Sequence, residues 1–65
     1  MRHYLFAFDS SHSARAFVKR LTLSLDHLAI FIEDCHVQVI DGGEFERRER
    51  ILQLARSSSA RLVVK

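Results

Sequence analysis

The stretch DSSHSAR, residues 9 to 15, contains the three residue types of a hydrolase triad: hydroxyl, imidazole and carboxyl. In a working triad the base reaches the hydroxyl and the acid orients the base, with about 2.6–3.2 Å between successive partners. Sequence neighbours rarely meet that geometry, and no GxSxG elbow surrounds these serines. Asp and Ser are also favoured where a helix begins, because their oxygens accept hydrogen bonds from free backbone amides. We therefore interpret the stretch as a helix start and expect a protein that is not an enzyme.

The same stretch leads into a basic segment that could contact an anion. The free amides and the dipole at the start of a helix favour a phosphate or a carboxylate. Residues 10–25 contain three Lys or Arg side chains and no acidic residue. The candidate anion or nucleic-acid contact consists of Ser11, His12, Arg15, Lys19 and Arg20. Because the formal net charge is only +2, the attraction expected for nucleic acid is small.

Four histidines and one cysteine raise the question of a metal site. Structural zinc sites normally show paired ligands at CxxC or HxxxH spacing, and neither spacing occurs in this chain. The one pair of interest is His3 and His36, which we place near the starts of two neighbouring parallel strands, facing away from the helices. Two imidazoles supply only half of a tetrahedral site. We therefore expect neither a metal nor a cofactor.

Length and composition predict one globular domain spanning residues 1–65. The chain is 48% hydrophobic and 28% charged and contains no proline. This composition is too apolar for intrinsic disorder. Its single cysteine cannot form an internal disulfide, and this favours a reducing compartment. Apolar runs such as LAIFI, residues 28–32, are too short for a signal-peptide core or a membrane span. We expect a cytoplasmic protein with no membrane partner.

The spacing of apolar residues divides the chain into six elements. Residues 3–9 alternate and predict a strand, while intervals of three and four predict an amphipathic helix from residue 11 to about residue 23. Two β-branched runs, HLAIFIED and CHVQVIDG, predict a hairpin that turns at residues 33–35. Helical spacing returns from Phe45 to Ala55, and Asp41 and Glu44 are spaced as a capping box. RLVVK predicts a short final strand.

The order βαββαβ predicts a two-layer α+β sandwich that resembles the ferredoxin-like fold. In that fold a four-stranded antiparallel sheet has strand order 4-1-3-2 and both helices lie on one face. Each predicted strand supplies an apolar row for the helix-covered face: Tyr4, Phe6 and Phe8; Leu28, Ile30 and Ile32; Val37 and Val39; Leu62 and Val64. The agreement of four separate strands is the consistency expected of a sequence that specifies one fold.

The other sheet face is predicted to be half apolar and uncovered. We expect it to be an interaction surface formed by Leu5, Phe31, His36, Gln38, Ile40 and Val63. Exposed apolar patches on small domains often mark contact sites, and two-fold homodimers are the commonest oligomers. The sequence therefore favours a non-enzymatic interaction module that self-associates, through this face or an edge strand, or docks on a protein partner. A solvated face without a partner is the alternative on this surface.

Weak nucleic-acid binding through the basic first helix is the second function that we consider. RNA-recognition modules stack bases on exposed aromatic residues of a ferredoxin-like sheet. Here the aromatic row of the first strand is predicted to face the helices. Phe31 is then the only aromatic residue expected on the uncovered face.

The opening residues YLFAFDSSHSARAFVKRL, about a quarter of the chain, resemble the start of small sulfur- or selenium-carrier domains. The later proline-rich and Cys-Gly elements of those carriers are missing here, because the chain has no proline and His36 follows Cys35. We therefore transfer no functional residue from this resemblance.

Overall fold

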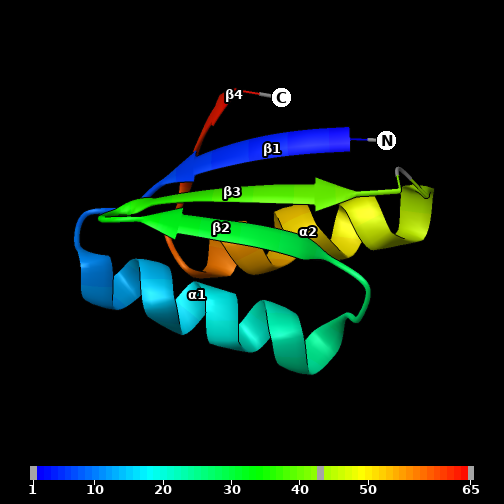
Figure 1. Ribbon diagram of the computed structural model, residues 1–65, viewed down its shortest axis with the longest axis horizontal. Helices are drawn as coiled ribbons and strands as arrows, with labels where there is room; N and C mark the ends of the chain where they lie inside the picture. Colours follow the sequence, from blue (N-terminus) through cyan, green and yellow to red (C-terminus); the bar gives the residue numbers. More distant parts are fainter. Residues whose placement is uncertain (1, 43, 65) are drawn as a thin grey trace.

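Strands and helices follow one another in the order βαββαβ in the computed structural model, which describes residues 2–42 and 44–64. The elements are β1 (Arg2–Ala7), α1 (Ser11–Ser24), β2 (Ala29–Glu33), β3 (His36–Asp41), α2 (Phe45–Ser57) and β4 (Arg61–Val64). The four strands form one sheet in the order β2-β3-β1-β4, and every neighbouring pair is antiparallel. Figure 1 shows both helices on the same side of this sheet. The predicted ferredoxin-like arrangement is confirmed.

The core lies between the sheet and the helices and is built around the aromatic row of β1. Tyr4, Phe6 and Phe8 are each no more than 3% exposed, as their alternation predicts. From α1, Phe17 packs edge-on against Phe6 with 5.4 Å between ring centroids and lies 5.1 Å from Phe8. Aromatic pairs at these separations contribute beyond the area that they bury. This contact anchors α1 to the central strand.

Helix α1 begins where the sequence predicts. Ser10 is the N-cap residue: its side chain accepts a hydrogen bond from the backbone N–H of Ser13 over 3.1 Å. The buried residues Ala14, Phe17 and Leu21 follow at intervals of three and four and form the face that packs on the sheet. The hydroxyl-rich stretch at residues 10–13 thus satisfies a helix end, which is the role that capping preferences assign to it.

The start of α2 differs from the sequence prediction. The N-cap residue is Glu44, whose side chain makes no capping hydrogen bond, and Asp41 is the last residue of β3. The predicted capping box is therefore wrong, because the Asp41 carboxylate is buried and accepts a hydrogen bond from Arg47 instead. Phe45 is 69% exposed, since the first turn of α2 extends past the end of β3 (Figure 1). The buried residues of the helix are Ile51 and Ala55.

Two turns depend on residues with positive φ. The β2–β3 hairpin closes with Glu33 paired to His36, so its loop is the two residues Asp34 and Cys35, one fewer than predicted. Asp34 has φ 56°, the left-handed conformation that Asp tolerates better than most residues. Ser59, two residues beyond the end of α2, has φ 59°, and the N–H groups of Ser59 and Ala60 donate to carbonyls of the last helical turn.

The two outer strands are less covered than their apolar rows predict. Ile32 of β2 is 43% exposed and Leu62 of β4 is 44% exposed, so the prediction that both are buried is wrong. Both residues lie on edge strands, and each is paired on one side only. The side chain of Val64, predicted in the same row as Leu62, lies outside the described residues. Within the described part of the chain, neither helix is long and apolar enough to cross a membrane.

Candidate interaction surface

The face of the sheet away from the helices carries three transverse rows of side chains. Strand register places Leu5 of β1 and Phe31 of β2 on either side of Gln38 of β3. Two further rows flank it: His3, Ile40 and Ala29 at one end, and Ala7, His36 and Glu33 at the other. Residues paired across antiparallel strands share a face. We call these nine residues the open face.

The middle row of the open face is its most apolar and most uneven part. Phe31 is 58% exposed, Leu5 is half-buried and Gln38 is exposed. Leu5 and Gln38 border two hollows, of about 180 Å³ towards His3 and about 110 Å³ towards Phe31 and His36. The surface thus presents apolar side chains next to a small number of polar groups, which is a composition found in protein contact sites.

Five of the six residues predicted for this surface lie together. Leu5, Gln38, Phe31, His36 and Ile40 are all within the three rows of the open face. Val63 is 54% exposed but lies where the β1–β4 register shifts, between the pairs Phe6–Leu62 and Leu5–Val64. Because such a bulge interrupts the alternation on which its placement rested, Val63 is left out of the open face.

The predicted proximity of His3 and His36 is wrong. Strands β1 and β3 are antiparallel, so His3 pairs with Ile40 and His36 pairs with Ala7, four positions apart along the ladder. At about 3.4 Å per residue, the two imidazoles belong to rows some 13 Å apart. His36 has Cys35 nearby, with 3.9 Å between Nδ1 and Sγ. The described residues contain no group of three or more His, Cys, Asp or Glu side chains placed to hold a metal.

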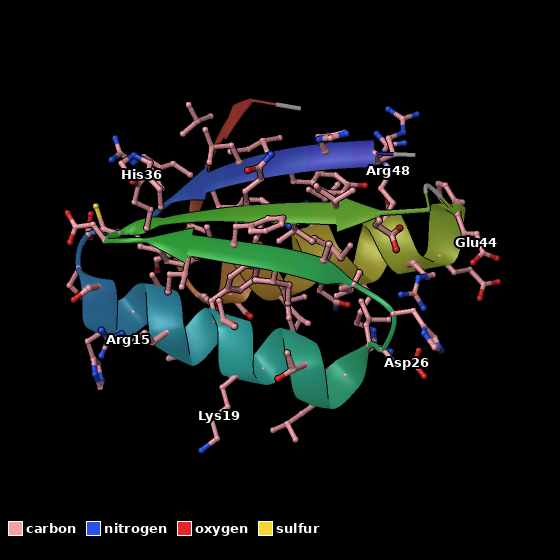
Figure 2. All side chains as sticks on the ribbon, viewed as in Figure 1. Arg15, Lys19, Asp26, His36, Glu44 and Arg48 are labelled. Carbon is pink, nitrogen blue, oxygen red and sulfur yellow. The ribbon has the colours of Figure 1, made fainter. Side chains whose placement is uncertain are left out.

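The basic residues of α1 lie on the opposite side of the molecule from the open face. Figure 2 shows Arg15 and Lys19 pointing away from the sheet, whereas His36 lies on the sheet's far side. Arg20 is exposed but hydrogen-bonded: its Nη1 donates to Oγ of Ser58 and its Nη2 to Oγ of Ser57, both over 3.1 Å. Arg20 therefore ties α1 to the end of α2, a contact that its position in the sequence did not reveal.

The candidate catalytic or anion-binding stretch forms no triad. The Ser10 hydroxyl donates to the Ser13 hydroxyl over 3.2 Å, and the same oxygen accepts the Ser13 amide. His12 and Ser11 are exposed in the first turn of α1, and Asp9 is exposed just before it. The Ser10 hydroxyl thus bonds to the Ser13 hydroxyl and to the backbone, as expected of a helix cap.

A buried ion pair was missed in the sequence. Arg47 donates from Nε to Oδ1 of Asp41 over 2.9 Å, and the Asp41 side chain is 1% exposed. The same guanidinium donates from Nη2 to the backbone carbonyl of Asp26, whose carboxylate lies 3.8 Å from Nη1. The hydrogen bond to Asp41 raises the pKa of Arg47 above its ordinary value. One side chain of α2 thereby joins the end of β3 to the loop that leads into β2.

Close to this pair lies a buried phenol. Tyr4 is 3% exposed, and its hydroxyl has no hydrogen-bond partner among the described residues. Burial raises the pKa of Tyr4 above 10.0, and the negative charge of Asp41 raises it further, while Arg48 and Arg2 act in the opposite direction. Tyr4 belongs to the aromatic row of β1, so the alternation that predicts a buried ring also buries the hydroxyl that this ring carries.

Comparison of the chain with protein-family models, with curated proteins and with solved structures finds no match.

Proposed function

We propose that this protein is a non-enzymatic interaction module that self-associates, and that the open face is the surface on which it docks. The observation that carries this proposal is the middle row, where Phe31 is 58% exposed and half-buried Leu5 lies on the other side of Gln38. Exposed apolar surface on a small domain is costly in water unless a partner covers it. A second copy of this chain is the partner that we choose, because two-fold homodimers are the commonest assemblies.

The position of the polar groups supports a protein contact over a small-molecule site. Gln38 borders both open hollows and His36 borders the smaller one, and both side chains are exposed. Ligand pockets for small molecules enclose most of the ligand surface, which open hollows of this size do not. An apolar row with a few polar groups around it is better suited to a broad, shallow partner surface.

The test is light scattering of the wild-type chain and of Phe31→Glu over a wide range of protein concentration. The wild-type mass should rise above the 7.5 kDa of the monomer as concentration increases, and Phe31→Glu should remain at the monomer mass. Leu23→Glu is the matched control, because Leu23 is 79% exposed on α1, in the layer opposite the open face. A wild-type chain that stays monomeric at every concentration contradicts the proposal.

Weak nucleic-acid binding through α1 is the second candidate. Arg15 and Lys19 lie one helical turn apart and project away from the sheet together (Figure 2). Each phosphate neutralised contributes about 0.9 to the slope of log affinity against log salt concentration, so two cations give a slope near 2. The double variant Arg15→Glu/Lys19→Glu should abolish retention on a heparin column at low salt. Arg50→Glu/Arg56→Glu on α2 makes the same change of charge and serves as the control.

A further inference from the structure

The outer edge of β2 carries backbone groups without a neighbouring strand. β2 is the first strand of the sheet and pairs only with β3. A strand at a sheet edge presents a row of N–H and C=O groups to any other extended chain. The question is which residues of β2 point these groups outwards.

The geometry of the β2–β3 hairpin determines which residues of β2 direct their backbone groups outwards. In a hairpin with a two-residue loop the flanking pair is hydrogen-bonded, so Glu33 bonds to His36 and the bonding alternates along the ladder through Phe31 to Ala29. On the other side of the hairpin, the carbonyl of Cys35 accepts from the amide of Phe8 over 2.8 Å, which directs the odd-numbered residues of β3 towards β1. The even-numbered residues of β3 therefore face β2. Ile30 and Ile32 are left to direct their N–H and C=O groups to the open edge.

β2 carries few of the devices that normally protect an edge strand. Proteins protect edge strands with lysines, prolines, bulges or very short strands. The other edge strand, β4, has four residues, pairs with β1 through a register shift and begins with Arg61. β2 has five residues, AIFIE, whose register with β3 runs without a shift and whose one charge lies at the end. Ile32 and Phe31, on opposite faces of β2, are 43% and 58% exposed.

We propose that two copies of this chain associate side by side, with β2 pairing antiparallel to β2 of the second copy across a two-fold axis at Phe31. Ile30 then pairs with Ile32 of the second copy, and the two pairs exchange four backbone hydrogen bonds. This register uses all five residues of the strand and no residue outside it. The inference rests on the proposed self-association, and it places the contact along the strand edge that borders the open face instead of across that face.

The side chains are complementary to themselves in this register. On the open face the two Phe31 rings meet at a non-hydrogen-bonded position, where Cα atoms approach to about 4.5 Å and side chains are closest. On the helix side Ile30 lies beside Ile32 of the second copy. Ala29 lies opposite Glu33, so no like charges face each other. Arg15 and Lys19 point away from the sheet and do not enter the seam (Figure 2).

Pairing at the edge would produce one continuous sheet of eight strands from the two four-stranded sheets. The open faces of both copies would then form a single surface with the two Phe31 rings near its centre. A seam of five residues from each copy is smaller than the 20 to 30 residues a side of standard interfaces. We therefore expect a dimer that dissociates on dilution.

The first test separates the edge from the face. Ile32→Pro removes an N–H that points outwards and breaks no bond within the chain, and edge strands tolerate proline at such positions. Ile32→Thr is its matched control, because it shortens the apolar side chain but keeps the N–H. We expect Ile32→Pro to weaken dimerisation at least tenfold in sedimentation equilibrium and Ile32→Thr to weaken it much less. Near-ultraviolet circular dichroism of the buried Tyr4 ring would report whether both variants remain folded.

The second test determines the register. In a Cys35→Ser background, Phe31→Cys places two thiols opposite each other within the Cα range of a disulfide, whereas two Ala29→Cys residues stand about 13 Å apart along the strands. Mild oxidation should give a covalent dimer for Phe31→Cys and none for Ala29→Cys. Equal cross-linking of both variants would overturn the register.

The outcomes of the edge proposal and of the proposed function can be distinguished. If Phe31→Glu abolishes self-association while a folded Ile32→Pro dimerises like the wild type, the copies meet through the open face and the edge seam is wrong. If both variants are monomeric and Ile32→Thr still dimerises, the edge seam is supported. If the wild-type chain is itself monomeric at all concentrations, both proposals fall.

Discussion

Arg47 and Asp41 form an ion pair between the first turns of α2 and the end of β3, with 2.9 Å from Nε to Oδ1. The carboxylate is 1% exposed, whereas the guanidinium is 22% exposed and continues to the loop at Asp26. A buried carboxylate is stabilised only where hydrogen bonds replace the water that it has lost. The loop before β2 is therefore held through a side chain of the second helix.

Arg47→Met is expected to destabilise the fold strongly, because it removes the guanidinium from a buried carboxylate. Thermal unfolding should show Tm lowered by several degrees. Arg50→Met, on the exposed part of the same helix, should change the free energy of unfolding by no more than about 0.5 kcal/mol. Adding Asp41→Asn to Arg47→Met should restore part of the loss, since it removes the buried charge. Equal effects of Arg47→Met and Arg50→Met would contradict a structural role for the ion pair.

Tyr4 should titrate above the ordinary tyrosine pKa. Burial disfavours the phenolate and raises the pKa of Tyr4 above 10.0, and Asp41 acts in the same direction. Because the folded state holds this proton more tightly than the unfolded state, the contribution to stability is complete below pH 10 and is lost as the pH rises through the folded pKa. The chain has one tyrosine and no tryptophan, so absorbance at 295 nm reports this group alone. A midpoint at or below 10 would contradict the burial of its hydroxyl.

Tyr4→Phe tests the same hydroxyl at neutral pH. The buried oxygen has no hydrogen-bond partner among the described residues, so removing it leaves the ring in place and deletes a desolvated polar group. A buried unsatisfied polar group costs about 1–3 kcal/mol, so urea unfolding of Tyr4→Phe should show a gain in stability of up to that size. The variant should also lose the decline in stability that the wild-type chain shows as the pH rises above 10. A loss of stability on this substitution would indicate that the hydroxyl makes a stabilising hydrogen bond.

Local patterns predicted the fold and most of the open face. The alternation in β1 places Tyr4, Phe6 and Phe8 on the covered side and Leu5 on the other, because successive strand residues point to opposite faces. The same parity predicts that Phe31 and Gln38 belong with Leu5. The serine that caps α1 is equally local, since Ser10 and its partner Ser13 are three residues apart.

The features that the sequence patterns did not predict depend on contacts between distant segments or on the direction of the strands. Arg20 reaches Ser57 and Ser58, and Arg47 reaches Asp26, over separations of 37, 38 and 21 residues. Alternation gives the face of Ile32 but not whether a helix covers it. The proximity assigned to His3 and His36 failed because their strands run in opposite directions, and alternation does not predict the register shift between β1 and β4 at Val63.

The C-terminus of α2 offers a substitution that should stabilise the protein. The N–H of Ala60 donates to the carbonyl of Ala55 over 2.9 Å and the N–H of Ser59 to that of Arg56 over 3.1 Å, the hydrogen bonds of a Schellman motif. Ser59 occupies the position with φ 59°, where an L side chain costs about 1–2 kcal/mol and glycine does not. Ser59→Gly should therefore raise the free energy of unfolding by about 1 kcal/mol in urea denaturation. Ser59→Ala keeps a Cβ at that φ and should bring no gain, and an equal gain from both substitutions would mean that the serine hydroxyl, rather than the backbone conformation, was the source of the cost.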